Sequence, residues 1–427
     1  MQKNLTWRVK SRHVFFVAGY HPMPVDGHFR VFTRELRRFA SVWSLKVACP
    51  EDAPAPTPTG MVWDVDTEGQ DWATHARFEL LAWDQMVQAD MQRPLWSHIR
   101  GSVRAMADMI SSGTLKRYFG VSRRYGLFFL FTYLMLFLIW AVAAGVGGAI
   151  GQWAAPHFGV ALSVLLGGLG ALACGLGLMR WPGQRLRLRQ SLDLAEFSVD
   201  YARGRHLAVD AQVRAFGQRL VDVARQGGVD EIVISGHSLG AMHVVSAVAE
   251  ALRIDPDFGR TVPVRLLTLG STTAKFALHP AGERLRVAAR EVAAASWIGW
   301  AEIQSRDDIV SFYKVNPVTL EPADVLDQNS VPGDFTSRPL IRHAAIRDML
   351  TAKTYNRFRL DIMRLHCQCF LASDKRAAHD FNAYICGPAR FDFLVAGTSG
   401  LMDFVRDDGS LQPRPARPVS ATSGARI

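Results

Sequence analysis

The pentapeptide Gly236-His237-Ser238-Leu239-Gly240 is the segment of this 427-residue chain best suited to catalytic chemistry. It matches the pattern G-x-S-x-G, in which a tight turn between a strand and a helix presents a serine hydroxyl for attack on a carbonyl carbon. The β-rich run 232–235 leads into the pentapeptide, and an Ala-rich helical pattern over 239–252 follows it. The backbone N–H of Leu239, near the start of that helix, could bind a developing oxyanion. The alternative is an ordinary glycine turn between a strand and a helix.

Residues 232–240 resemble the nucleophile elbow of the α/β-hydrolase superfamily, in its lipase and esterase branch. The expected strand 13–19 lies where this family places a second oxyanion-hole loop. The resemblance therefore implies the backbone N–H groups of Gly19 and Tyr20 as oxyanion donors beside Leu239. It covers most of residues 10–50 and 195–390. It implies an α/β fold with a mainly parallel sheet flanked by helices, and a serine hydrolase that cleaves an ester or thioester through an acyl-enzyme.

The triad acid and base follow the serine in this superfamily, in that order. Asp308 follows the expected strand 297–304, and the run Asp308-Ile309-Val310 resembles the acidic loop of the family. The resemblance therefore implies Asp308 as the acid, with Asp307 as the alternative. A pair of solvated aspartates that caps a strand is the competing interpretation.

Three histidines beyond Asp308 are candidates for the base. His343 stands among basic residues, and we interpret it as a surface residue. Parts of the segment 364–388 resemble a pattern in bacterial membrane hydrolase-like proteins of unassigned role, in which the earlier histidine recurs. We therefore favour His366 as the base and keep His379 as the alternative. The competing interpretations are a buried core histidine for His366 and a surface loop residue for His379.

The elements that must position these residues alternate between strand and helix. This alternation is typical of an α/β sheet. Besides the strand and helix beside Ser238, the patterns predict strands over 13–19, 42–49, 78–83, 264–269 and 297–304, and helices over 29–40 and 206–225.

Two long uncharged stretches interrupt this α/β pattern. Residues 125–150 and 158–179 contain no charged side chain. As helices they would measure about 39 and 33 Å, enough to cross a hydrocarbon core of about 30 Å. With a short loop at 152–157 they predict a two-helix transmembrane hairpin, in which glycines would allow close packing. A pair of buried core helices is the alternative.

The positive charges of the chain indicate how this hairpin is oriented. Lys and Arg total 49 against 39 Asp and Glu, a net charge of +10. Between Met109 and Leu192 every charged residue is basic, and all of them flank the two stretches, whereas the loop 152–157 has none. The positive-inside rule places both flanks, and both soluble parts with them, in the cytoplasm. The sequence therefore predicts an integral protein of the inner (cytoplasmic) membrane.

Other chemistries find little support in the sequence. It contains no phosphate-binding P-loop and no G-x-G-x-x-G after a strand, so we expect no cofactor. His366, Cys367, Cys369 and Cys386 match no standard zinc spacing, so we expect no metal and interpret the cysteines as small buried thiols. Five cysteines are too few and too scattered for a disulfide framework. The basic residues gather beside the spans, which argues against nucleic acid as a partner.

These patterns predict a hydrolase-like domain that a membrane hairpin interrupts. Residues 1–115 and 191–395 would form the two parts of the domain, and 116–190 the hairpin with its basic flanks. The Pro-, Ser- and Arg-rich segment 396–427 would be a largely disordered tail. The expected partners are the lipid bilayer and an acyl ester or thioester, with lipid esters within reach of the tethered site; protein partners are unknown. The alternative function is a catalytically inactive hydrolase-like membrane scaffold.

Overall fold

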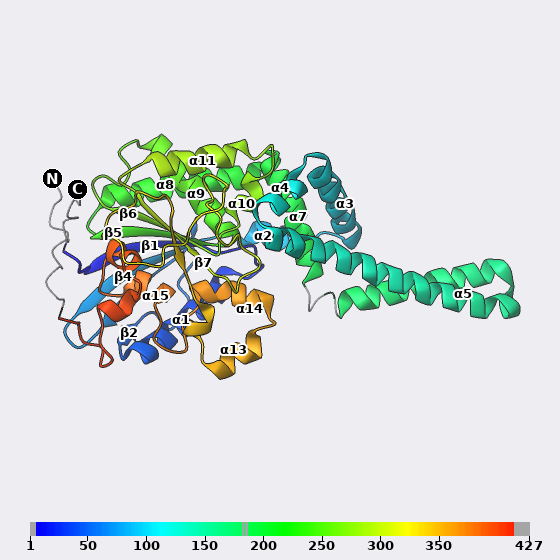
Figure 1. Ribbon diagram of the computed structural model, residues 1–427, viewed down its shortest axis with the longest axis horizontal. Coiled ribbons are helices and arrows are strands. Elements are labelled where there is room, and N and C mark those ends of the chain that lie inside the picture. Colours follow the sequence, from blue (N-terminus) through cyan, green and yellow to red (C-terminus); the bar gives the residue numbers. More distant parts are fainter. Residues whose placement is uncertain (1–5, 182, 184–186, 414–427) are drawn as a thin grey trace, which may run out of the picture.

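The computed structural model describes residues 6–181, 183 and 187–413, and their strands form one mixed eight-stranded sheet (Figure 1). Its spatial order is β2-β3-β4-β1-β5-β6-β7-β8. The strands from β4 to β8 in this order pair in parallel, whereas β2, β3 and β4 pair antiparallel. The predicted α/β class is confirmed, with a mixed sheet. The strands are β1 (Ser11–Val17), β2 (Lys46–Ala48), β3 (Gly60–Glu68), β4 (Ala73–Leu81), β5 (Glu231–His237), β6 (Val264–Leu269), β7 (Gly299–Gln304) and β8 (Leu340–His343).

Helices cover both faces of this sheet. Helices α8, α9 and α11 lie over one face, and α1 and α15 lie over the other (Figure 1). The helices are α1 (Val25–Trp43), α2 (Asp84–Met91), α3 (Leu95–Ser111), α4 (Thr114–Val121), α5 (Arg123–Arg180), α7 (Leu188–Ala202), α8 (Leu207–Gln226), α9 (Leu239–Ile254), α10 (Thr273–Ala277), α11 (Glu283–Ala294), α12 (Ile346–Met349), α13 (Ala352–Phe358), α14 (Ile362–Cys367), α15 (Phe381–Cys386) and α16 (Phe391–Ala396), with 3-10 turns η1 (Gln368–Phe370) and η2 (Gly400–Asp403).

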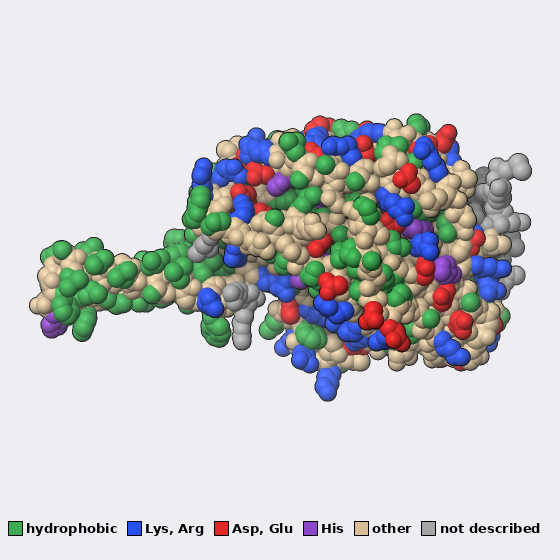
Figure 2. All heavy atoms as spheres, turned by 180° about the vertical axis from the view of Figure 1, so that it is seen from behind, with side chains coloured by type: hydrophobic (Ala, Val, Ile, Leu, Met, Phe, Trp, Pro, Cys, Tyr) green, Lys and Arg blue, Asp and Glu red, His purple; other side chains and the backbone are tan. Residues whose placement is uncertain are grey.

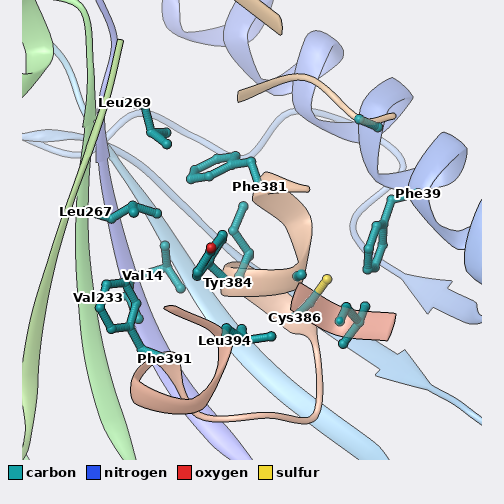
Figure 3. Packing of buried hydrophobic residues seen from close by; sticks show 14 of the residues in the cluster. Val14, Phe39, Val233, Leu267, Leu269, Phe381, Tyr384, Cys386, Phe391 and Leu394 are labelled. Carbon is teal, nitrogen blue, oxygen red and sulfur yellow. The ribbon is translucent and has the colours of Figure 1, made fainter. Parts of the chain in front are cut away.

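Alternating side chains of the central strands supply the core on each face. Val14 of β1 packs on the α1 and α15 side, whereas its neighbour Phe15 packs on the α8 and α9 side. Successive side chains of a strand point to opposite faces, so one buried strand feeds two cores. Figure 3 shows the first core, where Val14 and Val233 lie beside Phe391. These cores hold the strand ends, and with them the candidate site, in place.

Helix α5 projects from the rest of the molecule as an arm (Figure 1). Among the described residues it is the one helix long and apolar enough to cross a membrane. The predicted loop at 152–157 is wrong, because these residues are helical and α5 is one element. Its backbone leaves helical geometry at Gly159 (φ 74°, ψ 166°), just after Pro156. The stretches on either side touch, since a Cβ on Gly147 would lie 2.5 Å from the backbone oxygen of Gly167.

Several element boundaries differ from those predicted. The predicted strand 42–49 shrinks to Lys46–Ala48, because α1 continues to the fully buried Trp43. The predicted helices 206–225 and 239–252 correspond to α8 and α9. Strand β3 and helices α2 to α4 lie in segments for which no element was predicted.

The chain remains packed beyond residue 396, where the tail was predicted to begin. Val405 is fully buried. The Trp72 indole N–H donates a hydrogen bond of 2.9 Å to the carbonyl oxygen of Gly409. Ordered packing therefore extends into the first part of the predicted tail, and residues 414–427 lie outside the described residues.

Candidate functional site

Ser238 occupies the turn between β5 and α9 with φ 56° and ψ −118°, a conformation that few residues with a side chain adopt. Its N–H donates a hydrogen bond of 3.0 Å to the carbonyl oxygen of Leu269 on the next strand. The turn requires both glycines of the pentapeptide. A Cβ on Gly236 would lie 2.4 Å from the Gly240 oxygen, and a Cβ on Gly240 would lie 2.0 Å from the Val17 oxygen. The backbone is thus crowded into a sharp turn with the serine at its apex.

Asp308 and His366 form a buried pair. His366 Nδ1 lies 2.8 Å from Asp308 Oδ2, and the two side chains are 1% and 3% exposed. Asp308 Oδ1 accepts hydrogen bonds from the backbone N–H groups of Val310 (2.9 Å) and Ser311 (3.3 Å). Burial raises the pKa of Asp308, but the charge and hydrogen bond of His366, with the other hydrogen bonds, outweigh burial and lower it below its ordinary 3.8. Because an ionised carboxylate only accepts hydrogen bonds, Nδ1 carries the proton of a neutral His366.

Gly270 makes room for this pair at the end of β6. Its φ is 50°, which favours glycine. A Cβ at this position would lie 3.1 Å from Asp308 Oδ2 and 3.4 Å from His366 Cε1. Ser238, Gly270 and Asp308 thus follow the ends of β5, β6 and β7. The carboxyl ends of neighbouring parallel strands are where open α/β sheets bind their ligands.

Ser238 and His366 line one cavity of about 460 Å³. His366 Nε2 is buried and has no hydrogen-bond partner among the described residues. The His237 ring, beside Ser238, packs on the His366 ring at 4.6 Å between centroids, and its Nε2 lies 3.1 Å from the His366 carbonyl oxygen. Burial and the charge of His366 lower the pKa of His237 to about 3, so this ring is neutral and donates to that carbonyl. His237 therefore holds the His366 backbone in place and does not occupy the His366 Nε2 atom.

The residues predicted as oxyanion donors lie beside Ser238 in the chain or in the fold. A Cβ on Gly19 would lie only 2.9 Å from Ser238 Cβ, so the loop after β1 passes directly against the serine. Leu239 is the first residue of α9, and the first N–H groups of a helix have no partner within it. The Tyr20 carbonyl accepts a hydrogen bond of 2.7 Å from Gln190 Nε2, which fixes the loop. Tyr20, Gly19 and Ser238 line the same cavity.

The structure does not bring the alternative acid and base to this cavity. The Asp307 carboxylate accepts a hydrogen bond of 3.5 Å from Tyr355 Oη, and Asp307 is not among the described residues that line the cavity. The competing interpretation of His379 as a surface loop residue is wrong, because this ring is 4% exposed and its Nε2 lies 2.7 Å from the Cys369 carbonyl oxygen. Burial lowers the pKa of His379 to about 4, so it serves as a neutral core histidine. His343 is exposed, as predicted.

Several cavity residues were not predicted from the sequence. Tyr125 and Phe129 of α5 line the cavity together with Ser238, as do Lys275 and Arg364. Lys275 is 3% exposed. Burial lowers its pKa to about 7, and its Nζ donates a hydrogen bond of 3.1 Å to the Leu194 carbonyl oxygen. The one signal in the sequence is that Lys275 is the single charged residue in the segment 270–278, which follows β6.

The cysteines near His366 do not form a metal site. Within the described part of the chain, no group of three or more His, Cys, Asp or Glu side chains could hold a metal ion. Burial raises the pKa of the Cys367 thiol to about 12, which disfavours the thiolate that a metal needs.

Comparisons with known proteins add nothing to this geometry. No family model matches the sequence, and no curated protein or solved structure matches it.

Proposed function

We propose that this chain is a membrane-tethered serine hydrolase of the α/β-hydrolase type, which cleaves an ester or thioester through an acyl-enzyme on Ser238. One observation carries the proposal. Ser238, on a strained turn at the end of β5, shares a cavity with the unpartnered Nε2 of His366, whose Nδ1 is bound to Asp308. This arrangement supports the proposal because it offers a candidate nucleophile, a candidate base and an acid that orients the base.

The chemistry follows from these positions. His366 Nε2 takes the Ser238 hydroxyl proton as Oγ bonds to the acyl carbon. The protonated His366 then gives this proton to the leaving alcohol or thiol as its bond to the acyl carbon breaks. Water next attacks the acyl carbon and passes a proton to Nε2, and the bond to Ser238 Oγ breaks as the serine regains that proton. Asp308 stays ionised and stabilises the imidazolium.

Backbone N–H groups supply the electrostatic part of catalysis. We assign this role to the N–H of Leu239, which follows Ser238 at the start of α9, and to those of the Gly19–Tyr20 loop, which passes against Ser238. One such donor contributes about 3 kcal/mol of transition-state stabilisation in enzymes of this kind. Because these donors belong to the backbone, they are oriented before the substrate binds.

The surface of α5 supports a membrane tether. Phe137 and Val160 are 68% and 78% exposed, and Figure 2 shows hydrophobic side chains along the whole arm. Soluble monomers rarely expose an apolar surface of this extent. We place the two parts of α5 on either side of Gly159 across the inner membrane as two spans. Their basic flanks and the hydrolase domain then lie on the cytoplasmic side.

The proposal is tested by ester turnover of the full-length protein in detergent micelles. Wild type should release nitrophenol from p-nitrophenyl butyrate, and Ser238→Ala should reduce turnover to background. Ser296→Ala, a change at an exposed serine, is the matched control and should retain wild-type turnover. Background turnover by a folded wild-type protein would contradict the proposal and favour a hydrolase-like scaffold.

A further inference from the structure

The base of α5 forms one wall of the cavity that holds Ser238. The lining includes Tyr125, Phe128, Phe129 and Tyr133, which belong to the first turns of this helix. Figure 1 shows α5 leaving the globular part at this point and extending outward. If α5 spans the bilayer, the cavity lies where the helix enters the membrane surface.

This wall is held firmly against the domain. The Tyr125 ring stacks on Phe312 at 3.9 Å between centroids, and both rings are buried. In the preceding helix α4, the Tyr118 hydroxyl donates a hydrogen bond of 2.8 Å to the carbonyl oxygen of Lys275. Lys275 also lines the cavity. The apolar wall is therefore a fixed part of the site, in contact with the tether on one side and the catalytic cavity on the other.

A second surface at the same end of the molecule suits a bilayer. Trp96, Val103 and Ile110 of α3 are 63%, 61% and 61% exposed. Their spacing of seven residues places them on one face of the helix. Helix α3 lies beside the base of α5 in Figure 1. An exposed apolar stripe with a tryptophan is typical of a helix that rests on the membrane interface.

Positive charge dominates the polar lining of the cavity. Among its described lining residues, Arg34, Arg187, Lys275 and Arg364 stand against one carboxylate, Asp361. The Asp361 carboxylate accepts from the backbone N–H of Arg364 at 2.9 Å. Arg34 is paired with a neighbouring glutamate. Within the described part of the chain, no salt bridge joins Arg187, Lys275 or Arg364 to a carboxylate.

Two of these cations share the cavity with the candidate base. Arg187 and Arg364 line it together with Ser238 and His366, and Arg364 precedes His366 by two residues on α14. Arg187 is exposed and Arg364 is half-buried. Guanidinium groups without a carboxylate partner are suited to bidentate binding of a phosphate.

We infer that the substrate is a membrane lipid ester with an anionic phosphate headgroup, which reaches Ser238 directly from the bilayer along the base of α5. Its acyl chain lies against the aromatic wall, and its phosphate binds Arg187 and Arg364. This inference rests on the proposed hydrolase activity and names its substrate class.

The test uses full-length protein in nonionic detergent micelles that contain equal small amounts of phosphatidylglycerol and of diacylglycerol, which lacks the phosphate, with the same acyl chains and one of them isotopically labelled. Both lipids compete in one micelle, and the variants below separate binding in the cavity from general attraction of an anionic lipid to the basic protein. Fatty acid release is measured by mass spectrometry. We expect about tenfold preference for phosphatidylglycerol, the effect of one charge-assisted hydrogen bond.

The variant Arg187→Gln/Arg364→Gln should reduce this preference to near unity. Arg187→Gln alone changes an exposed side chain and should halve the preference at least, even if the double variant misfolds. Arg214→Gln, on the exposed surface of α8, is the matched control and should keep the wild-type ratio.

Each outcome separates this inference from the function on which it rests. Equal release from the two lipids, or a preference that survives in Arg187→Gln/Arg364→Gln, would overturn the inference. The proposed hydrolase activity would still stand if the wild-type protein turns over p-nitrophenyl butyrate. If the wild-type protein cleaves neither the butyrate ester nor the lipids, both the proposed function and the inference are overturned.

Discussion

Replacing Asp308 by Asn should move the proton of the candidate base, His366, from Nδ1 to Nε2. Asp308 Oδ1 accepts from the N–H groups of Val310 and Ser311, at 2.9 and 3.3 Å, and an asparagine oxygen can keep both bonds. The asparagine amide nitrogen then replaces Oδ2, which lies 2.8 Å from His366 Nδ1. An amide nitrogen only donates, so Nδ1 must accept and the proton moves to Nε2. A protonated Nε2 cannot take the proton of Ser238.

The expected loss is large because the pair is buried. Both side chains are almost fully excluded from water, so no solvent molecule can replace the lost contact. The same substitution in Ser-His-Asp triads lowers kcat by about 10⁴-fold, which corresponds to about 5 kcal/mol of activation free energy. We expect a loss of this order here, with folding preserved.

The assay is kcat for p-nitrophenyl butyrate, with thermal midpoints measured on the same samples. Asp307→Asn is the matched control and should remain within about threefold of wild type, since Asp307 binds Tyr355 whereas His366 is paired with Asp308. A folded Asp308→Asn that retains a tenth or more of wild-type turnover would refute the tautomer argument. Loss of activity in Asp307→Asn alone would assign the acid to that residue.

Three further substitutions test the surroundings of the site. Gly19→Ala places a Cβ 2.9 Å from Ser238 Cβ, so butyrate turnover should fall about a hundredfold as an oxyanion donor is displaced; turnover close to wild type would contradict this placement. Burial raises the pKa of Glu302 from 4.5 to about 7. Between these pH values the carboxyl is neutral in the folded protein but ionised in the unfolded chain, so the free energy of unfolding declines as pH rises through that interval. Glu302→Gln should therefore gain up to about 3 kcal/mol at pH 8 and little at pH 4; equal shifts in thermal midpoint at the two pH values would argue against it. His379→Ala should keep turnover within about threefold and lower the thermal midpoint, because the ring binds the Cys369 carbonyl oxygen in the core; lost turnover in a folded sample would make His379 the base.

The turn at Ser238 was predictable because most of its signals are local. Gly236 is required by a close approach to the Gly240 oxygen, and a β-rich run and a helical run flank the pentapeptide within a few residues. Only the close approach of Gly240 to the Val17 oxygen comes from a distant part of the chain. The same holds for α8, whose apolar residues recur at helical spacing, and for α9, whose Ala-rich composition favours a helix. Elements whose signals lie within a few neighbouring residues can therefore be predicted from the sequence.

The base could not be chosen on the same grounds. His366 meets Asp308 across 58 residues of chain, and the packing of β6 through Gly270 places them together. His379 stands in a polar segment, yet tertiary packing buries it. The break in α5 was likewise misplaced, because a long uncharged run carries no hydropathy signal for the position where the chain departs from helical geometry.

The cavity walls were the least predictable part. Tyr125 lines the cavity but precedes Ser238 by more than a hundred residues, and it lies in a stretch that the sequence predicts to be a membrane span. Only the fold shows that the base of this helix is buried against Phe312 and borders the site. The charged lining of the cavity was equally unpredictable, since the fold brings Arg187 and Arg364 together from separate segments of the chain.

Labelling by a fluorophosphonate probe, located by mass spectrometry, tests most directly whether Ser238 is an activated nucleophile. The folded wild-type protein should carry one adduct on the peptide that contains Ser238, and Ser238→Ala should carry none. Ser296→Ala should be labelled like wild type. A folded wild-type protein without an adduct, or with its adduct on another serine, would contradict the assignment of Ser238, His366 and Asp308 as a catalytic triad.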